Sequence, residues 1–260
     1  MKRLVVKIGT GNLINSSGNL DPNKTSDIAR QVANLVAQDI DVILVSSGSI
    51  KAGRERMATM GQNPNLAKKE WAGVGARHLL NLWGNSFEVY GLDVAQVWLT
   101  YTNWTHEQEY KSIKSSILSF LKSGIIPLIN ENDVVSQREI ELMEAGISEN
   151  DRLARMVAEM IGADAVLFLT DIGGIYDKDP RTDASARRYK SVGRDIFHQI
   201  GESESQSDHG TGGIGTKLAE AFRCFDAGMR VAVAGQEKDL ILNFASGKDV
   251  GTMIGYVSII

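Results

Sequence analysis

Lys7 is the first residue whose place in the sequence could do chemistry, because it interrupts an otherwise apolar run. Residues 4–8 read LVVKI, the pattern of a buried strand. Burying an ammonium group costs free energy unless the charge is paired or binds an anion. Lys7 therefore indicates contact with an anion such as a phosphate. The alternative is a lysine on an edge strand, with its charged end in water.

A glycine-rich segment late in the chain could also bind an anion. Residues 210–217 read GTGGIGTK and open a predicted helix at 215–228, with Lys217 in its first turn. Backbone N–H groups at a helix N-terminus bind anions readily. The segment fits GxGxxG, but the polar loop predicted at 202–211 replaces the strand that a dinucleotide site needs. It is not a Walker A motif, and a flexible loop with a glycine N-cap remains the alternative.

Small and polar residues follow four of the predicted strands. They form the segments KIGT at 7–10, SSGS at 46–49, NEND at 130–133 and TDIGG at 170–174. Ligands of open parallel sheets bind beyond the carboxyl ends of the strands. Glycine in such segments lets backbone amides approach an anion closely. The four ends together predict a shared cleft.

Asn150 and Asp151 lie side by side where a helix is predicted at 150–161. The segment 148–151 reads SEND, and Ser-x-x-Asp before an apolar helix is the pattern of a capping box. Capping accounts for Ser148 but not for the adjacent amide and carboxylate. The residues alone therefore support a capping role and a role in a site equally.

Strands and helices alternate along the chain. The predicted strands are 3–8, 41–45, 94–99, 125–129, 165–169 and 230–234, and the predicted helices are 25–38, 64–86, 107–122, 150–161 and 215–228. This order indicates an α/β fold with a mostly parallel sheet covered on both faces. The chain enters a second series of strands and helices near residues 163–164. Two lobes that share one sheet and two separable domains both fit this pattern.

Composition excludes several classes of function. The 260 residues carry a formal net charge of −4, without the basic surplus of a nucleic-acid-binding protein. The single cysteine, Cys224, permits no disulfide framework and is expected to be buried. The four histidines lack metal-ligand spacing, so no metal site is predicted. No segment has the roughly 20 apolar residues of a membrane span, and no signal peptide is evident, so we expect a cytoplasmic protein.

Six segments, in one order along the chain, resemble the amino acid kinase family. They are VVKIGTGNL at 5–13, VSSGSIKAGR at 45–54, AGVGARHLLNLW at 72–83, IPLINENDVV at 126–135, LTDIGGIYDKDPR at 169–181 and GTGGIGTK at 210–217. The fourth is the most specific. It resembles the members of the family that phosphorylate the side-chain carboxylate of glutamate.

This resemblance implies a three-layer αβα sandwich with a mostly parallel central sheet, formed by one domain over 1–260. The N-terminal lobe, about 1–163, would bind L-glutamate, and the C-terminal lobe, about 164–260, would bind ATP. The products would be ADP and γ-glutamyl phosphate, in the first step of proline biosynthesis, with Mg²⁺ as cofactor. A carboxylate is already a nucleophile at neutral pH, and phosphoryl transfer mainly needs alignment and neutralised charge.

The resemblance also implies roles for individual residues. Lys7 and Lys217 would contact the transferring phosphate, and Asp151 would orient both lysines. Glutamate would be bound by Ser47, Gly48, Asn130, Asp133 and Asn150. The nucleotide would be bound by Lys7, Gly9, Thr170, Asp171, Thr211, Gly212, Gly213, Ile214, Gly215, Thr216 and Lys217.

The chain departs from the family pattern in two places. Residues 148–151 read SEND where the family usually has Gly-Asp-Asn-Asp, and the stretch before them is longer than usual. We expect residues Val134 to Ile147 to form a mobile flap or hairpin over the glutamate pocket, with Gly146 as a hinge. The same loop bears on feedback inhibition by proline in the family. The chain ends at Ile260, so we expect no C-terminal RNA-modification-type (PUA) domain.

Other activities remain as alternatives. The family also phosphorylates acetylglutamate, aspartate, UMP and isopentenyl phosphate, and a non-catalytic nucleotide sensor could keep the same fold. Both lysines argue against a sensor, and the segment 130–133 favours glutamate. We expect a homo-oligomer, a dimer or tetramer, with no nucleic-acid or membrane partner.

Overall fold

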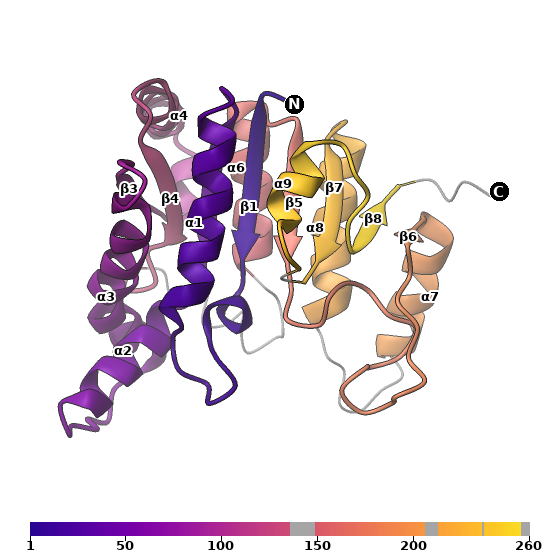
Figure 1. The fold of residues 1–260 in the computed structure, drawn as a ribbon, viewed down its shortest axis with the longest axis horizontal. Coiled ribbons are helices and arrows are strands. Elements are labelled where there is room, and N and C mark those ends of the chain that lie inside the picture. The colour runs from indigo at the N-terminus through magenta and orange to yellow at the C-terminus, as the bar shows by residue number, and fades with distance from the viewer. Residues whose placement is uncertain (136–148, 206–212, 236, 256–260) are drawn as a thin grey trace.

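The computed structural model describes residues 1–135, 149–205, 213–235 and 237–255. These residues form one eight-stranded sheet in the order β3-β4-β2-β1-β5-β7-β8-β6 (Figure 1). The strands are β1 (Arg3–Ile8), β2 (Asp41–Ser46), β3 (Val94–Leu99), β4 (Ile126–Glu131), β5 (Ala165–Leu169), β6 (Ser191–Val192), β7 (Arg230–Ala234) and β8 (Thr252–Ile254). β8 pairs antiparallel with β7, and the other described pairs are parallel.

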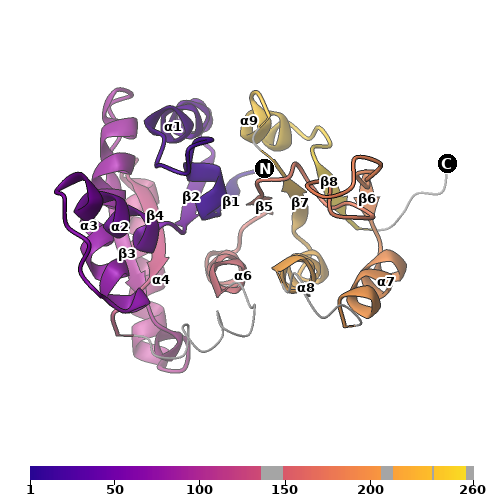
Figure 2. The ribbon, with the colours of Figure 1, turned by 90° about the horizontal axis from the view of Figure 1, so that it is seen from below.

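Helices cover both faces of this sheet, so the predicted three-layer αβα sandwich is confirmed. They are α1 (Pro22–Val36), α2 (Ser49–Thr59), α3 (Lys68–Glu88), α4 (Glu107–Lys122), α6 (Glu149–Ile161), α7 (Arg194–Ser205), α8 (Gly213–Asp226) and α9 (Leu240–Ala245). Two short 3₁₀ helices, η1 (Thr10–Leu13) and η2 (Tyr101–Trp104), follow β1 and β3. Figure 2 shows α1 and α9 on one face, and α4, α6, α7 and α8 on the other. None of the described helices is long and apolar enough to cross a bilayer.

Strand β1 lies in the middle of the sheet and faces a separate hydrophobic core on each side. Leu4, Val6 and Ile8 pack in the core with α1, α3 and α9, whereas Val5 packs in the core with α6 and α8. Side chains alternate between the two faces of a strand. Lys7 therefore projects on the side of α6 and α8. It is only 4% exposed, so the alternative of an edge-strand lysine is wrong.

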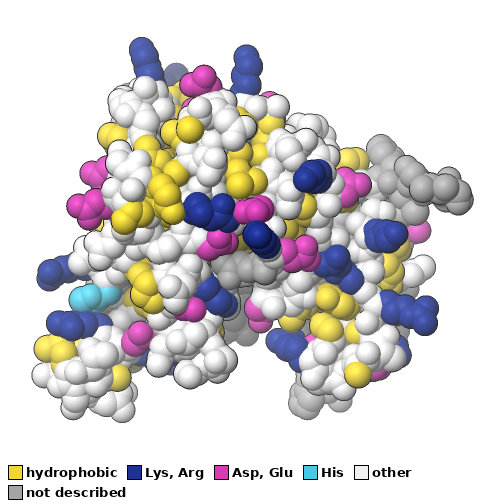
Figure 3. Space-filling model, viewed as in Figure 1, with side chains coloured by type: hydrophobic (Ala, Val, Ile, Leu, Met, Phe, Trp, Pro, Cys, Tyr) yellow, Lys and Arg dark blue, Asp and Glu magenta, His cyan; other side chains and the backbone are white. Residues whose placement is uncertain are grey.

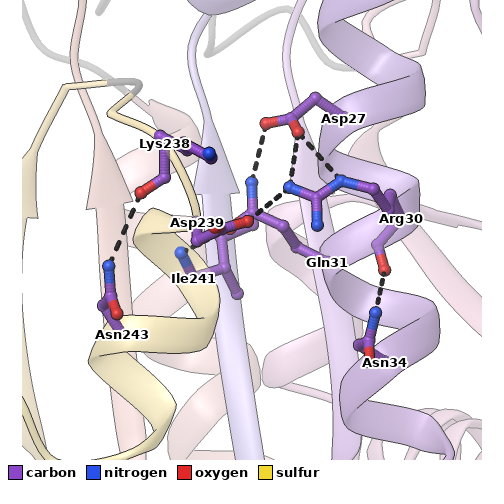
Figure 4. A network of polar contacts seen from close by, with 8 residues as sticks. All are labelled: Asp27, Arg30, Gln31, Asn34, Lys238, Asp239, Ile241 and Asn243. Atoms are coloured by element: carbon purple, nitrogen blue, oxygen red, sulfur yellow. Dashed lines mark hydrogen bonds and ion pairs between the residues drawn. The ribbon is translucent and has the colours of Figure 1, made fainter.

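A polar network joins α1 to α9 on the face of the sheet opposite Lys7 (Figure 4). Arg30 donates to Asp27 and, at 2.6 Å, to Asp239 in the turn before α9. Gln31 donates to Asp27 Oδ2 and accepts from the backbone N–H of Ile241, both at 2.8 Å. Helices from distant parts of the chain are thereby fixed to each other.

Several predicted elements have the predicted bounds, and others were missed. The strands at 3–8, 94–99, 165–169 and 230–234 and the helix at 107–122 are as predicted. Helices α2 and α7 and the short elements β6, β8 and α9 were not predicted. Residues 202–205, assigned to a polar loop, instead belong to α7. Cys224 is buried as expected, and burial raises the pKa of its thiol to about 12.

Candidate active site

The predicted polar strand ends meet at one edge of the sheet. Ile8 at the end of β1 is in register with Ser46 of β2 on one side and with Leu169 of β5 on the other. After β1, the strands β2, β3 and β4 lie on one side of it in the sheet, and β5 and the later strands lie on the other side. A topological switch point therefore lies between β1 and β5. In Figure 3 the molecule is notched at this lower edge, between its two halves.

Three charged side chains from distant parts of the chain meet at this edge. Asp151, in the first turn of α6, is completely buried and accepts from both lysines. Lys7 Nζ lies 2.9 Å from its Oδ1, and Lys217 Nζ, from the fifth residue of α8, lies 2.9 Å from both carboxylate oxygens. Two ammonium groups share one carboxylate, which leaves one positive charge unbalanced. An anionic ligand such as a phosphoryl group would balance it.

The titration of this cluster follows from its geometry. Burial raises the pKa of Asp151, but the charges of Lys217 and Lys7 outweigh it and hold the pKa at about 2. For Lys217, burial and the charge of Lys7 lower the pKa to about 8, although Asp151 opposes the shift. Lys217 therefore carries its proton at neutral pH and begins to lose it only slightly above.

The predicted glutamate-binding residues Ser47 and Asn150 lie in contact beside this cluster. Asn150 Nδ2 donates to Ser47 Oγ at 2.7 Å. The amide oxygen of Asn150 is buried and accepts no hydrogen bond from the described residues. A buried amide oxygen without a donor is costly, so it offers a position for a ligand N–H group. Gly48 follows with a φ of 117°, a conformation that favours glycine, and α2 begins after it.

Asn130 and Asp133, at the end of β4, differ in their surroundings. Asn130 is buried, donates to Ser49 Oγ at 2.9 Å and accepts from the N–H of Glu131. Its contacts therefore hold the start of α2, next to Ser47 and Gly48. Asp133 lies half-buried in the turn after β4, and its carboxylate forms no ion pair or hydrogen bond with other described residues. It is available for a cationic group of a ligand.

Among the residues predicted to bind the nucleotide, the segments that follow β1 and β5 lie against each other. A Cβ at Gly9 would lie 3.6 Å from Lys7 Nζ, and a Cβ at Gly11 would lie 3.0 Å from Asp171 Cβ. Thr170 is held by its N–H, which donates to Ala234 O at 2.8 Å, while Asp171 is exposed. The first five residues of α8 are Gly213, Ile214, Gly215, Thr216 and Lys217.

The amino acid kinase family model matches residues 2–235 of the chain. The chain belongs to the amino acid kinase family.

Relatives of this amino acid kinase include bacterial glutamate 5-kinases. The enzyme of Dehalococcoides mccartyi is 37% identical over 96% of this chain and 68% of its own. The enzyme of Caldanaerobacter subterraneus subsp. tengcongensis is 36% identical over 96% of this chain and 67% of its own. Among solved structures, UMP kinase from Bacillus anthracis superposes with a TM-score of 0.65 at 17% identity, covering 98% of this chain and 96% of that one. That likeness shows the shared fold.

Some predicted positions of the amino acid kinase site lie outside the described residues. These are Thr211 and Gly212 of the glycine-rich segment, Ser148 of the capping-box pattern, and the predicted flap apart from Val134 and Val135. No group of three or more His, Cys, Asp or Glu side chains that could hold a metal ion occurs in the part of the chain that the structure describes.

Supporting contacts that the sequence did not reveal hold the segment around Ser47. Trp83 Nε1 donates to Ser46 Oγ at 3.1 Å. Helices α2 and α3 touch through Gly53 and Gly75, and a Cβ at Gly75 would lie only 1.8 Å from the carbonyl oxygen of Ser49. Both glycines occur in the family-like segments 45–54 and 72–83. A glycine in each of these two segments was the available signal for close contact between the helices.

Proposed function

We propose that this amino acid kinase transfers the γ-phosphoryl group of ATP to the side-chain carboxylate of L-glutamate. The products are ADP and γ-glutamyl phosphate, and the reaction is the first step of proline biosynthesis. The buried cluster of Asp151 with Lys7 and Lys217 carries this proposal, because it combines a surplus positive charge with a place at the strand ends. The similarity to glutamate 5-kinases over 96% of the chain supports glutamate as the acceptor.

The cluster fits phosphoryl transfer to a carboxylate. The acceptor is ionised at neutral pH, so no strong base is required. Lys7 and Lys217 neutralise the negative charge shared by the donor and the acceptor, and Asp151 holds both at fixed positions. Backbone N–H groups at the start of α8 add hydrogen bonds to phosphate oxygens. We propose Mg·ATP as the nucleotide form, because Mg²⁺ is commonly held by phosphates with few protein ligands.

Residues from about 1 to 163 supply the glutamate side in this proposal, and residues from about 164 to 260 supply the nucleotide side. Ser47, Gly48, Asn150 and Asp133 would bind glutamate directly, while Asn130 would act through Ser49. The direct test is ATP-dependent formation of γ-glutamyl hydroxamate from L-glutamate and hydroxylamine. UMP, aspartate and acetylglutamate serve as competing acceptors. Turnover of one of these instead of glutamate would replace the proposal.

Glutamate should be a far better substrate than N-acetylglutamate. Asp133 offers its unpaired carboxylate to the free ammonium group, and acetylation removes that charge. Breaking a fully buried charge pair costs about 2–5 kcal/mol, and Asp133 is only half-buried, so we expect the lower end of this range and a fall in kcat/KM of at least about tenfold. Asp133→Asn should raise the KM for glutamate and narrow the difference between the two substrates. Equal kcat/KM values for both in the unmodified enzyme would remove Asp133 from the binding site.

The kcat/KM for ATP should fall as the pH rises through about 8, the pKa of Lys217. The folded enzyme holds this pKa below the ordinary lysine value, so the ammonium form is complete only at lower pH. kcat/KM reports the ionisation of the free enzyme. Lys217→Arg should keep its charge and show no decline in this range. A decline at the same pH in that variant would assign the titration to another group.

We further propose that the protein works in the cytoplasm as a homo-oligomer, a dimer or tetramer, and that proline is a feedback inhibitor. The resemblance supports all three statements. Light scattering after size-exclusion chromatography measures the oligomer. Proline titration at subsaturating glutamate tests inhibition, and unchanged rates would remove proline as a regulator.

A further inference from the structure

Helices α6 and α8 carry a second ion pair, one turn beyond the active-site cluster. Arg155 Nε donates to Glu220 Oε2 at 2.5 Å, and the two side chains are only 15% and 10% exposed. Arg155 follows Asp151 by four residues, and Glu220 follows Lys217 by three, so each lies one helical turn after an active-site residue. The two helices start at the same edge and lie side by side under the sheet (Figure 2).

The two pairs have opposite polarity. In the pair nearer the helix starts, α6 contributes the acid, Asp151, and α8 contributes the base, Lys217. One turn further along, α6 contributes the base and α8 the acid. A slip of α8 by one turn, about 5.4 Å, would place Lys217 against Arg155 or Glu220 against Asp151. Like charges meet in either case, so this charge pattern favours a single register of the two helices.

Contacts within each helix hold the second pair in place. Arg155 also donates to Glu159 Oε2 at 2.7 Å, and Glu220 also accepts from Arg223. The four charges balance. Because desolvation offsets much of the attraction in such a network, its main effect is on geometry and less on stability.

We propose that Arg155 and Glu220 are positioning residues that fix the register of α8 on α6 and so keep Lys217 at Asp151 and Lys7. This inference rests on the proposed function for its activity readout. It goes beyond that function because the position of Lys217 would depend on an ion pair that contacts no substrate.

The test compares the double variant Arg155→Met/Glu220→Leu, which removes both charges, with the control Glu159→Gln. The control changes a contact of Arg155 within α6 and leaves the pair between the helices. Loss of register should lower kcat roughly ten- to a hundredfold in the double variant, since small displacements of catalytic groups have effects of that size. The KM for glutamate should change little, by less than about twofold, and the control should keep normal kcat.

Two further measurements make the outcome decisive. ATP affinity, measured by calorimetry, should also fall as the pH rises and Lys217 loses its proton. In the double variant this fall should occur at lower pH, because Lys217 loses the charge of Asp151 that raises its pKa. Glu220→Gln keeps a hydrogen bond to Arg155 and should show an intermediate loss of kcat. This milder variant tests the inference even if the double variant does not fold. Normal kcat and an unshifted pH dependence in the double variant, or normal kcat in Glu220→Gln, would overturn the inference. Absence of glutamate turnover in the unmodified enzyme would instead overturn the proposed function. The calorimetric measurement of ATP affinity would then still test whether the Arg155–Glu220 pair positions Lys217.

Discussion

Asp151→Asn is expected to lower kcat by about 10²–10³, the size of effect that follows from disabling one preorganised group that stabilises transition-state charge. Asp151 is completely buried, and its carboxylate is shared by both lysines. An amide in its place leaves two ammonium groups in contact without a counter-charge. Lys217 would then lose its proton at neutral pH, because burial and Lys7 already lower its pKa and Asp151 opposes them.

The measurement is ADP release at saturating glutamate and ATP, with circular dichroism to confirm the fold. The free energy of unfolding should also lose the part of its acid dependence that Asp151 contributes. The pKa of Asp151 is lowered in the folded protein to about 2 from 3.8, so its contribution is present above the higher value and is lost as the pH falls towards the lower one. Asp133→Asn is the matched control, since it removes a carboxylate of the same site that pairs with neither lysine. A normal kcat in Asp151→Asn would show that the lysines need no acidic partner.

Lys217→Ala should lower kcat by about 10²–10³ while the fold persists, which is the usual cost of removing a preorganised group that stabilises transition-state charge. Its removal leaves Lys7 and Asp151 as a balanced pair, so the surplus positive charge of the cluster disappears. The remaining ion pair keeps Asp151 from being buried alone.

Lys217→Arg should recover only part of the rate, because a guanidinium is planar and longer than an ammonium group. Steady-state kinetics in ATP distinguish two roles for Lys217. An unchanged kcat with a raised KM for ATP in Lys217→Ala would mean that the lysine only anchors ground-state phosphates, which would contradict its role in stabilising the transition state.

The sheet could be predicted because its strands are short apolar runs that end at polar residues. β1, β3, β5 and β7 have the predicted bounds. Helix α2 was missed because its few buried residues include a glycine, Gly53, and its position depends on contact with Gly75 of α3. β6 has only two residues and β8 three, which is too short for an alternating pattern. Such elements are determined by their neighbours in the sheet more than by their own sequence.

The site was predictable in its residue types but not in all its contacts. A lysine in an apolar strand and a lysine at a glycine-rich helix start both indicated an anion, and the structure brings Lys7 and Lys217 to the same carboxylate. The shared role of Asp151 came from family resemblance, since capping explained the local pattern equally well. The Arg155–Glu220 pair was missed because no sequence pattern shows that α6 and α8 are neighbours.

The central place of β1 has a consequence for how the chain is made. β1 is synthesised before both strands that pair with it: β2 follows soon after, but β5, which covers the other edge, begins only at Ala165. Until β5 is made, an apolar strand therefore has an open edge, which is a hazard for aggregation. Lys7 is the charge inside the apolar run 4–8 of that strand, and Arg3 lies at its start. The residue that we propose to contact phosphate would thus also discourage the nascent chain from pairing with another copy.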